Sequence, residues 1–184
     1  MRTWKKRSPR IHSRFAIKRP EGFAVPLPFS FLRPPGAAPE KELRARCVSC
    51  GQCVAVCAFR CLEMTPDSLL SPDTPKIFHR RSPCFLCMKC SDICPTGALR
   101  PVPAEKAGMG MAYLDIKRCV DYQEENHIMC WTCYERCPLR GTAIVLQNGY
   151  RPAVTDKCVG CGVCEYVCPV KAVTVLPAWR RGEK

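Results

Sequence analysis

Cysteine spacing constrains this chain more than any other feature of its sequence. Seventeen of the 184 residues are cysteine, and sixteen of them form four sets of four. Three sets have the pattern C-x-x-C-x-x-C-x-x-x-C, whereas the third has ten residues in its first gap. Proline follows the last cysteine in three sets, and Ala58 follows it in the first. The sets are Cys47, Cys50, Cys53 and Cys57; Cys84, Cys87, Cys90 and Cys94; Cys119, Cys130, Cys133 and Cys137; and Cys158, Cys161, Cys164 and Cys168.

This spacing predicts iron–sulfur clusters. Three thiolates two residues apart lie on a tight turn that can wrap three irons of one [4Fe–4S] cubane. The fourth thiolate, three residues further on, begins a helix that points away, so it ligates the partner cluster of a two-cluster unit. A proline after it suits the first turn of a helix, where the missing N–H costs nothing. We therefore predict four [4Fe–4S] clusters held by all sixteen cysteines, with Cys61 left over.

Two other uses of cysteine fit the pattern less well. A disulfide framework favours an even number of cysteines and an export signal, and the sequence indicates neither. Structural zinc sites pair two C-x-x-C knuckles across a longer loop, and they have no use for a third cysteine two residues on. The fourfold repetition of three cysteines plus one therefore favours iron–sulfur clusters over zinc.

The rest of the composition predicts a small α+β fold that depends on its bound clusters. Aromatic residues make up only 8% of the chain and eighteen prolines interrupt it, so a conventional apolar core would be thin. Asn148-Gly149 between apolar runs predicts a hairpin. A β-prone stretch at 97–102 is followed by another at 111–116, and we expect these two stretches to pair. Each set thus has a strand, a cluster-binding loop, a short helix and a second strand, and two sets make one ferredoxin-like module.

We accordingly predict a four-cluster domain of two ferredoxin-like modules over residues 47–177, followed by a short tail at 178–184. The order in which the sets pair stays open. Sequential pairing joins the first set with the second and the third with the fourth. Nested pairing joins the first with the fourth and the second with the third. Both schemes fit the linker lengths, and both use the same sixteen ligands.

Residues 1–46 form a basic, largely irregular N-terminal arm in this interpretation. They carry 12 Lys/Arg against 3 Asp/Glu, a net charge of +9. We expect the arm to dock on a partner protein or at a membrane surface, with nucleic acid less favoured. No run approaches the roughly 18 apolar residues of a membrane helix, so no transmembrane segment is expected. We predict packing or surface roles for His12, His79 and His127, and a small apolar role for Cys61 in a helix after the first set.

The region from Leu32 to Pro177 resembles the NapG/MauM group of ferredoxin-type proteins. The resemblance is carried by the LRPPGA run at 32–37, the CVSCGQC run at 47–53 and the CPTGAL run at 94–99. It continues with MGMA at 109–112, the stretched third motif CWTCYERCPL at 130–139 and the CVGCGVC run at 158–164. Members of the group usually begin with a twin-arginine export signal, and we do not expect one in this chain.

The resemblance implies a relay protein that passes electrons from a membrane-bound quinol-oxidising subunit toward another redox protein. It also favours the nested pairing. We expect an electron-transfer subunit without a catalytic site of its own, located in the cytoplasm and held at the inner face of the membrane by its partners; the alternative location is the periplasm, reached by export together with a signal-bearing partner. The alternative is a freestanding soluble polyferredoxin that shuttles electrons between enzymes.

Overall fold

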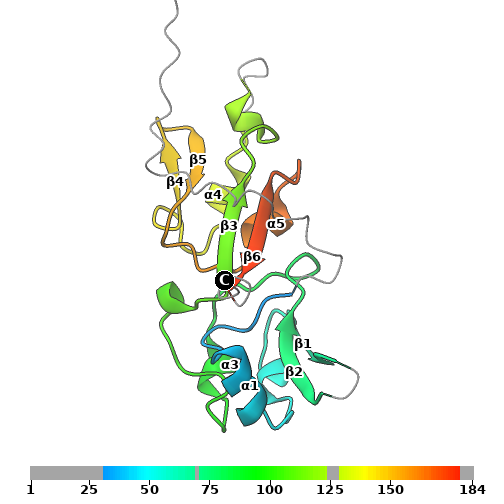
Figure 1. The fold of residues 1–184 in the computed structure, drawn as a ribbon. Coiled ribbons are helices and arrows are strands. Elements are labelled where there is room, and N and C mark those ends of the chain that lie inside the picture. The colour runs from blue at the N-terminus through cyan, green and yellow to red at the C-terminus, as the bar shows by residue number, and fades with distance from the viewer. Residues whose placement is uncertain (1–30, 69–70, 124–128, 179–184) are drawn as a thin grey trace, which may run out of the picture.

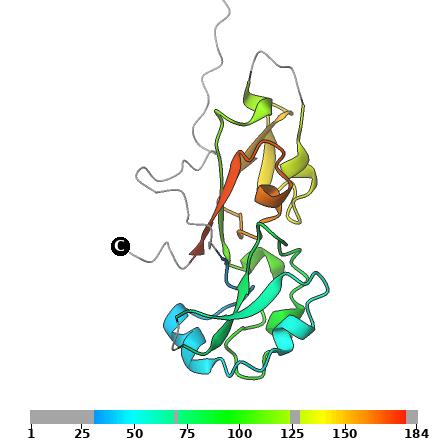
Figure 2. The same ribbon diagram turned by 90° about the vertical axis from the view of Figure 1, so that its right-hand side faces the viewer.

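Short helices and short strands alternate along the whole described chain. The structure, a computed structural model, describes residues 31–68, 71–123 and 129–178. We call residues 31–107 the N-terminal half and residues 108–178 the C-terminal half. They lie one below the other in Figures 1 and 2. Among the described helices, none is long and apolar enough to cross a membrane. The prediction of a small fold of mixed helices and strands is confirmed.

The N-terminal half is built around one hairpin and one pair of short helices. Strands β1 (Leu62–Pro66) and β2 (Asp73–Ile77) pair antiparallel. Helix α2 (Gln52–Ala55) follows the second cysteine of the first set, α3 (Lys89–Asp92) follows that of the second set, and the two helices contact each other. A longer helix, α1 (Glu40–Arg46), precedes the first set. A 3₁₀ turn at Ala104–Lys106 ends this half.

The C-terminal half repeats this plan. Helices α4 (Thr132–Glu135) and α5 (Val163–Val167) contact each other, and β4 (Ile144–Gln147) pairs with β5 (Arg151–Val154) in a hairpin. An outer pair encloses them: β3 (Gly110–Leu114) precedes the third cysteine set and β6 (Val173–Pro177) follows the fourth. A 3₁₀ turn at Val120–Tyr122 fills part of the long gap in the third set. Each half therefore contains two consecutive sets.

The turn between β4 and β5 was predicted correctly from the sequence. Asn148 and Gly149 both have positive φ, 53° and 79°, which is the backbone geometry of a type I′ hairpin turn. The Tyr150 N–H donates to the Gln147 carbonyl oxygen across this turn at 3.2 Å. Because Asn and Gly adopt positive φ at little cost, these two residues fix the register of the hairpin.

The predicted pairing of residues 97–102 with 111–116 was wrong. Residues 110–114 do form a strand, β3, but its partner is β6, some sixty residues later. The stretch at 97–102 instead contacts the chain entry of the N-terminal half, where Ala37 bridges to Leu99 and Arg100 N–H donates to the Gly36 carbonyl oxygen at 2.8 Å. Both stretches are β-prone, and only tertiary contacts decide which partner each one finds.

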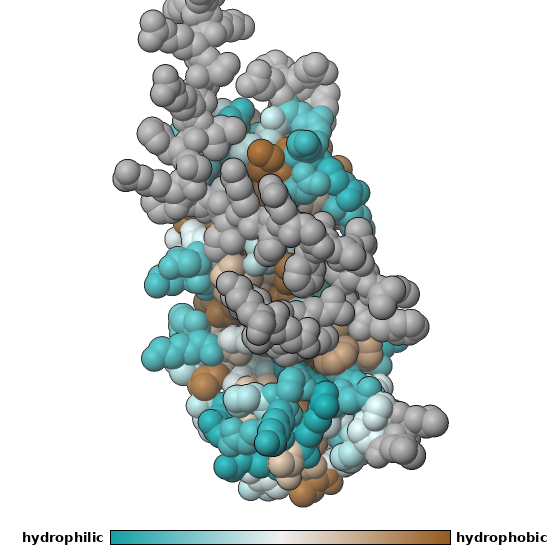
Figure 3. All heavy atoms as spheres, viewed as in Figure 1, coloured by the Kyte–Doolittle hydropathy of each residue, from teal (hydrophilic) through white to brown (hydrophobic). Residues whose placement is uncertain are grey.

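The arm was predicted to be irregular up to residue 46, and its described part differs from that prediction. Residues 40–46 form α1, and Leu32 and Leu43 are fully buried. Gly36 has a φ of +68°, and a side chain there would overlap with the Arg100 carbonyl oxygen. The end of the arm is therefore packed onto the N-terminal half, and Figure 3 shows hydrophilic side chains gathered over α1 on the visible surface. Residues 1–30 and 179–184 lie outside the described residues.

Arg33 connects the segment before the first cysteine set, residues 31–46, to the β1–β2 hairpin. Its guanidinium is only 6% exposed and makes a two-pronged contact with Glu40, at 2.8 Å from Nε to Oε1 and from Nη2 to Oε2. It also binds Asp67 at 2.9 Å and donates to the Thr74 hydroxyl at 2.9 Å. Burial of Asp67 raises the pKa of its carboxyl, but Lys76 and Arg33 lower that pKa on balance. A buried guanidinium needs this many acceptors to offset its desolvation.

We predict that Arg33→Leu destabilises the protein by about 3 kcal/mol, because the buried Asp67 side chain and the half-buried Glu40 lose their main cation. The value lies at the low end for a broken buried pair, since Lys76 and Arg44 still contact Asp67. The melting temperature of the cluster-loaded protein, measured without oxygen, checks this. Arg46→Leu is the control, because the Arg46–Glu42 pair is half-exposed and should cost less than about 1 kcal/mol. Equal melting shifts for both variants would contradict the role given to Arg33.

Candidate iron–sulfur cluster sites

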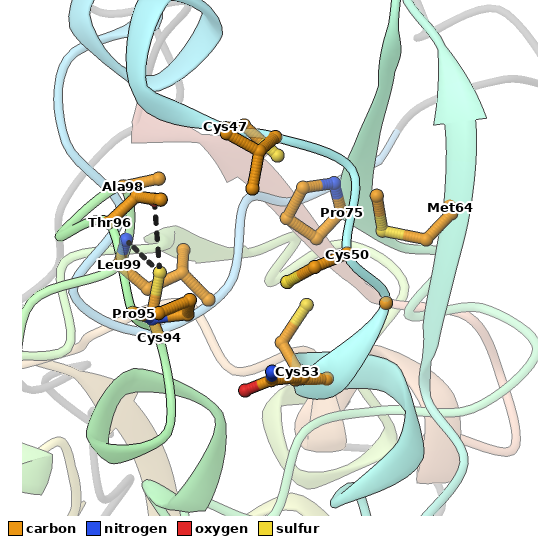
Figure 4. Close-up of a pocket in the computed structure, with 13 residues that line it drawn as sticks. Cys47, Cys50, Cys53, Met64, Pro75, Cys94, Pro95, Thr96, Ala98 and Leu99 are labelled. Carbon is orange, nitrogen blue, oxygen red and sulfur yellow. Dashed lines mark hydrogen bonds between the residues drawn. The ribbon is translucent and has the colours of Figure 1, made fainter.

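Four cysteines from two different sets line one pocket in the N-terminal half. Cys47, Cys50 and Cys53 come from the first set, and Cys94 is the last cysteine of the second set. Figure 4 shows them around a common space, with Met64 and Pro75 of the hairpin at its side. About 350 Å³ of space lies among these side chains outside the protein atoms, part of it open to solvent. The fourth cysteine of one set thus joins the first three of its neighbour.

The C-terminal half has a second pocket of the same kind. Cys158, Cys161 and Cys164 of the fourth set line it together with Cys137, the last cysteine of the third set. About 320 Å³ of space lies among its side chains outside the protein atoms, part of it open to solvent. Its lining is largely apolar, with Leu139, Ile144 and Val163 among the side chains. The two pockets repeat the same arrangement of three cysteines plus one.

The other eight cysteines are brought together in the complementary way. Burial raises the pKa of the Cys90 thiol to about 12, and nearby Cys84, Cys87, Cys53 and Cys57 add to the rise; of these, Cys53 also lines the first pocket. In the C-terminal half, burial raises the pKa of the Cys133 thiol to about 12. Its neighbours Cys119, Cys168 and Cys130 act in the same direction. Like charges raise a thiol pKa only when they are close, so each of these groups also combines three cysteines of one set with the fourth of another.

The cysteine sets therefore associate sequentially in space. The resemblance had favoured the nested order, and the contacts correct that expectation: α2 contacts α3, and α4 contacts α5. The physical reason is that each hairpin, β1–β2 and β4–β5, returns the chain directly beside the set it has just left.

Left-handed backbone shapes every cysteine loop. The residue after the second cysteine has positive φ in all four sets: Gly51 at 72°, Met88 at 60°, Trp131 at 45° and Gly162 at 88°. Only two of these residues are glycine, so Met88 and Trp131 hold a conformation that costs a side-chain-bearing residue about 1 kcal/mol or more. The repeated turn is what allows three cysteines so close in sequence to face one space.

Backbone N–H groups point at several of the sulfurs. Leu99 N–H donates to Cys94 Sγ at 3.4 Å, Ala112 N–H to Cys158 Sγ at 3.4 Å, and Ala172 N–H to Cys168 Sγ at 3.2 Å. Burial raises the pKa of the Cys94 thiol, but hydrogen bonds from Leu99 and its neighbours lower it on balance. Such hydrogen bonds stabilise the thiolate, and thiolate is the form that binds metal.

The residues present fit [4Fe–4S] clusters. Every group supplies four thiols, which is the donor set of a cubane. The sulfurs are spread over the wall of a pocket instead of meeting at one point. Accordingly, within the described residues no group of three or more His, Cys, Asp or Glu side chains is close enough to hold a single metal ion. Burial raises the pKa of the Cys53 thiol to about 11 and of Cys161 to about 12, so cluster assembly must displace protons.

The sequence analysis did not predict two features near these sites. Cys61 is buried as predicted, but it precedes β1 instead of lying in a helix, and its Sγ is 3.6 Å from that of Cys57. His79 is fully buried and contacts Glu165 of α5. The histidine has no ligand spacing around it, and its partner lies 86 positions away, so no local pattern could have indicated the contact. His12 and His127 lie outside the described residues.

Comparison with known proteins agrees with this arrangement. A family model described as a 4Fe-4S dicluster domain matches residues 46–98, which contain the first and second cysteine sets. A model described as a 4Fe-4S binding domain matches residues 153–174, which contain the fourth set. The first match spans one pair of consecutive sets as a unit.

Several curated relatives are similar over most of the chain. The methylamine utilization ferredoxin-type protein MauM of Methylorubrum extorquens is 41% identical, over 79% of this chain and 72% of the relative. The ferredoxin-type protein NapG of Escherichia coli is 39% identical, over 79% of this chain and 70% of the relative. MauM of Paracoccus denitrificans is 39% identical, over 84% of this chain and 75% of the relative. The chain therefore belongs to the MauM and NapG family of ferredoxin-type proteins, and it transfers electrons as a [4Fe–4S] protein.

Proposed function

We propose that this protein holds four [4Fe–4S] clusters and relays single electrons through them. The observation that carries the proposal is the repeated grouping of three cysteines of one set with the fourth of its neighbour. The outer N-terminal site is Cys47, Cys50, Cys53 and Cys94, and the inner N-terminal site is Cys57, Cys84, Cys87 and Cys90. The inner C-terminal site is Cys137, Cys158, Cys161 and Cys164, and the outer C-terminal site is Cys119, Cys130, Cys133 and Cys168.

The chain itself supplies geometry and potential. A bound cluster provides the one-electron redox chemistry. The cysteine loops set its position, the N–H groups of Leu99, Ala112 and Ala172 stabilise negative charge on sulfur, and the apolar pocket walls limit water. These are the factors by which proteins tune cluster potentials. Because all four iron positions of each site take a thiolate, no iron is left for a substrate, and the protein acts without a catalytic site of its own.

The partners in this proposal are other redox subunits, including an integral membrane protein that is linked to the quinone pool. The support is the basic arm, whose net charge of +9 suits an acidic protein surface or an anionic membrane. The described end of the arm is anchored through Arg33 and α1, so an arm that docks on a membrane subunit would hold the cluster sites beside it. We propose a location in the cytoplasm, at the inner face of the membrane.

The cluster groups make a prediction about iron content. Cys94→Ser combined with Cys47→Ser should remove a single cluster and leave about 12 iron per chain, because both residues serve the same site. Cys94→Ser combined with Cys84→Ser should leave about 8, because these two residues, although from one set, serve different sites. Iron and acid-labile sulfide on anaerobically purified protein measure this. The reverse order of the two double variants would contradict the grouping.

The relay role makes a prediction about electron supply. Membranes from the source organism, given a quinol analogue, should bleach the visible absorption of the loaded protein in the absence of oxygen. A chain that lacks residues 1–30 should be reduced several-fold more slowly, whereas dithionite should reduce both chains equally. Reduction by the soluble fraction alone, with no dependence on membranes or quinol, would contradict the membrane-linked relay and favour a soluble shuttle.

A further inference from the structure

The two halves meet at two of the proposed cluster ligands. The Cys84 N–H donates to the Cys161 carbonyl oxygen at 3.1 Å. Both residues are buried, at 6% and 8% exposure. Cys84 belongs to the inner N-terminal site and Cys161 to the inner C-terminal site. A single hydrogen bond therefore joins ligands of two different sites, across the boundary between the halves.

Burial of the second cysteine in each set is consistent with this boundary. Cys50 and Cys87, both in the N-terminal half, are exposed, and Cys130 is half-buried. Cys161 holds the same position in the fourth set but is buried. The inner C-terminal site is thus covered at the position where the sites of the N-terminal half are open, and the cover is the loop that carries Cys84.

His79, a residue of the N-terminal half, connects the two halves at this boundary; we call its contacts with Glu165 the lock. It lies two residues after β2, is fully buried, and its Nε2 is 3.1 Å from Oε2 of Glu165 on α5. Glu165 directly follows the ligand Cys164. The histidine also packs onto Gly162 in the fourth cysteine loop, because a Cβ added to Gly162 would lie 2.5 Å from the His79 Cβ. The imidazole therefore occupies the space that the missing side chain leaves in the loop.

Glu165 completes the lock. Its Oε1 accepts a hydrogen bond from Arg80 Nε at 2.6 Å, and its Oε2 accepts one from the Val175 N–H on β6 at 2.6 Å. The carboxylate is only 8% exposed. One buried side chain thus connects two consecutive residues of the N-terminal half to a helix and a strand of the C-terminal half. Breaking the buried contacts of the Glu165 carboxylate is costly, so this network holds the two halves together at the boundary.

We propose that electrons cross between the halves at the Cys84–Cys161 contact, and that His79 is the positioning residue that keeps this contact short. The inference rests on the proposed function, since it needs both inner sites to hold clusters. With clusters held by Cys84 and its site on one side and by Cys161 and its site on the other, a single electron would pass between them without any bond forming or breaking. Because the rate of such transfer falls steeply with distance, the order of sites is outer N-terminal, inner N-terminal, inner C-terminal and outer C-terminal.

The test is the magnetic interaction between reduced clusters, measured by electron paramagnetic resonance on the full chain. His79→Ala should lose the part of the interaction signal that arises between the inner sites. His79→Gln should retain it, because the amide N–H of glutamine can donate to Glu165 from the position of Nε2. Thr74→Val is the matched control: Thr74 is equally buried and lies on β2, but its hydrogen bonds stay within the N-terminal half.

Iron and sulfide content separates failure of this inference from failure of the proposed function. If the parent chain holds fewer than four clusters, the proposed function fails. If parent and variants are fully loaded and His79→Ala leaves the interaction signal unchanged, the positioning role of His79 is contradicted, whereas the four-cluster proposal is not. If the His79→Ala variant does not assemble its clusters, Glu165→Gln is tested in its place. It keeps the shape of the side chain but removes the charge that holds His79 and Arg80, so its interaction signal should fall. An unchanged signal there overturns the inference as well.

Discussion

Sixteen thiols have to be brought together in four groups, and much of the structure follows from that demand. Cysteines from every set contribute to the main buried cluster, among them Cys53, Cys90, Cys119 and Cys164. Apolar residues such as Leu43, Ile77 and Val175 pack around them, most of them on short helices and strands. Without bound metal the thiols themselves would add little to stability, because they bury little apolar surface and hydrogen-bond poorly. Cluster ligation therefore takes the role that a larger apolar core has in proteins of this size.

Placement of the thiols is achieved by two repeated devices. A left-handed residue after the second cysteine of each set turns the loop back on itself. A hairpin then returns the chain so that the fourth cysteine of one set meets the first three of the next. Duplication of this unit gives two halves, and the halves are joined where Cys84 and Cys161 meet and where His79 reaches Glu165. Under the proposed function, this junction would connect the cluster sites of one half with those of the other.

Local features of this fold could be predicted from the sequence, and long-range ones could not. Cysteine spacing indicated the cluster loops and the short helices, and Asn148-Gly149 indicated the β4–β5 turn, because in both cases neighbouring residues determine the backbone. The pairing of β3 with β6 depends on packing between segments far apart, so the β-prone stretch at 97–102 was assigned the wrong partner. Arg33, inside the LRPPGA run, was recognised only as part of a family pattern. Its physical role depends on Glu40, Asp67 and Thr74, which no spacing rule connects.

The measurement that tests the central claim most directly is the amount of iron and acid-labile sulfide per chain in protein purified without oxygen. Four cubanes predict about 16 of each. About 12 of each would mean that one of the four groups is not a cubane, with the stretched third set and the proline-less first set as the places to look. Stoichiometric zinc without sulfide would contradict the account, because the thiols would then stabilise the fold and carry no electrons.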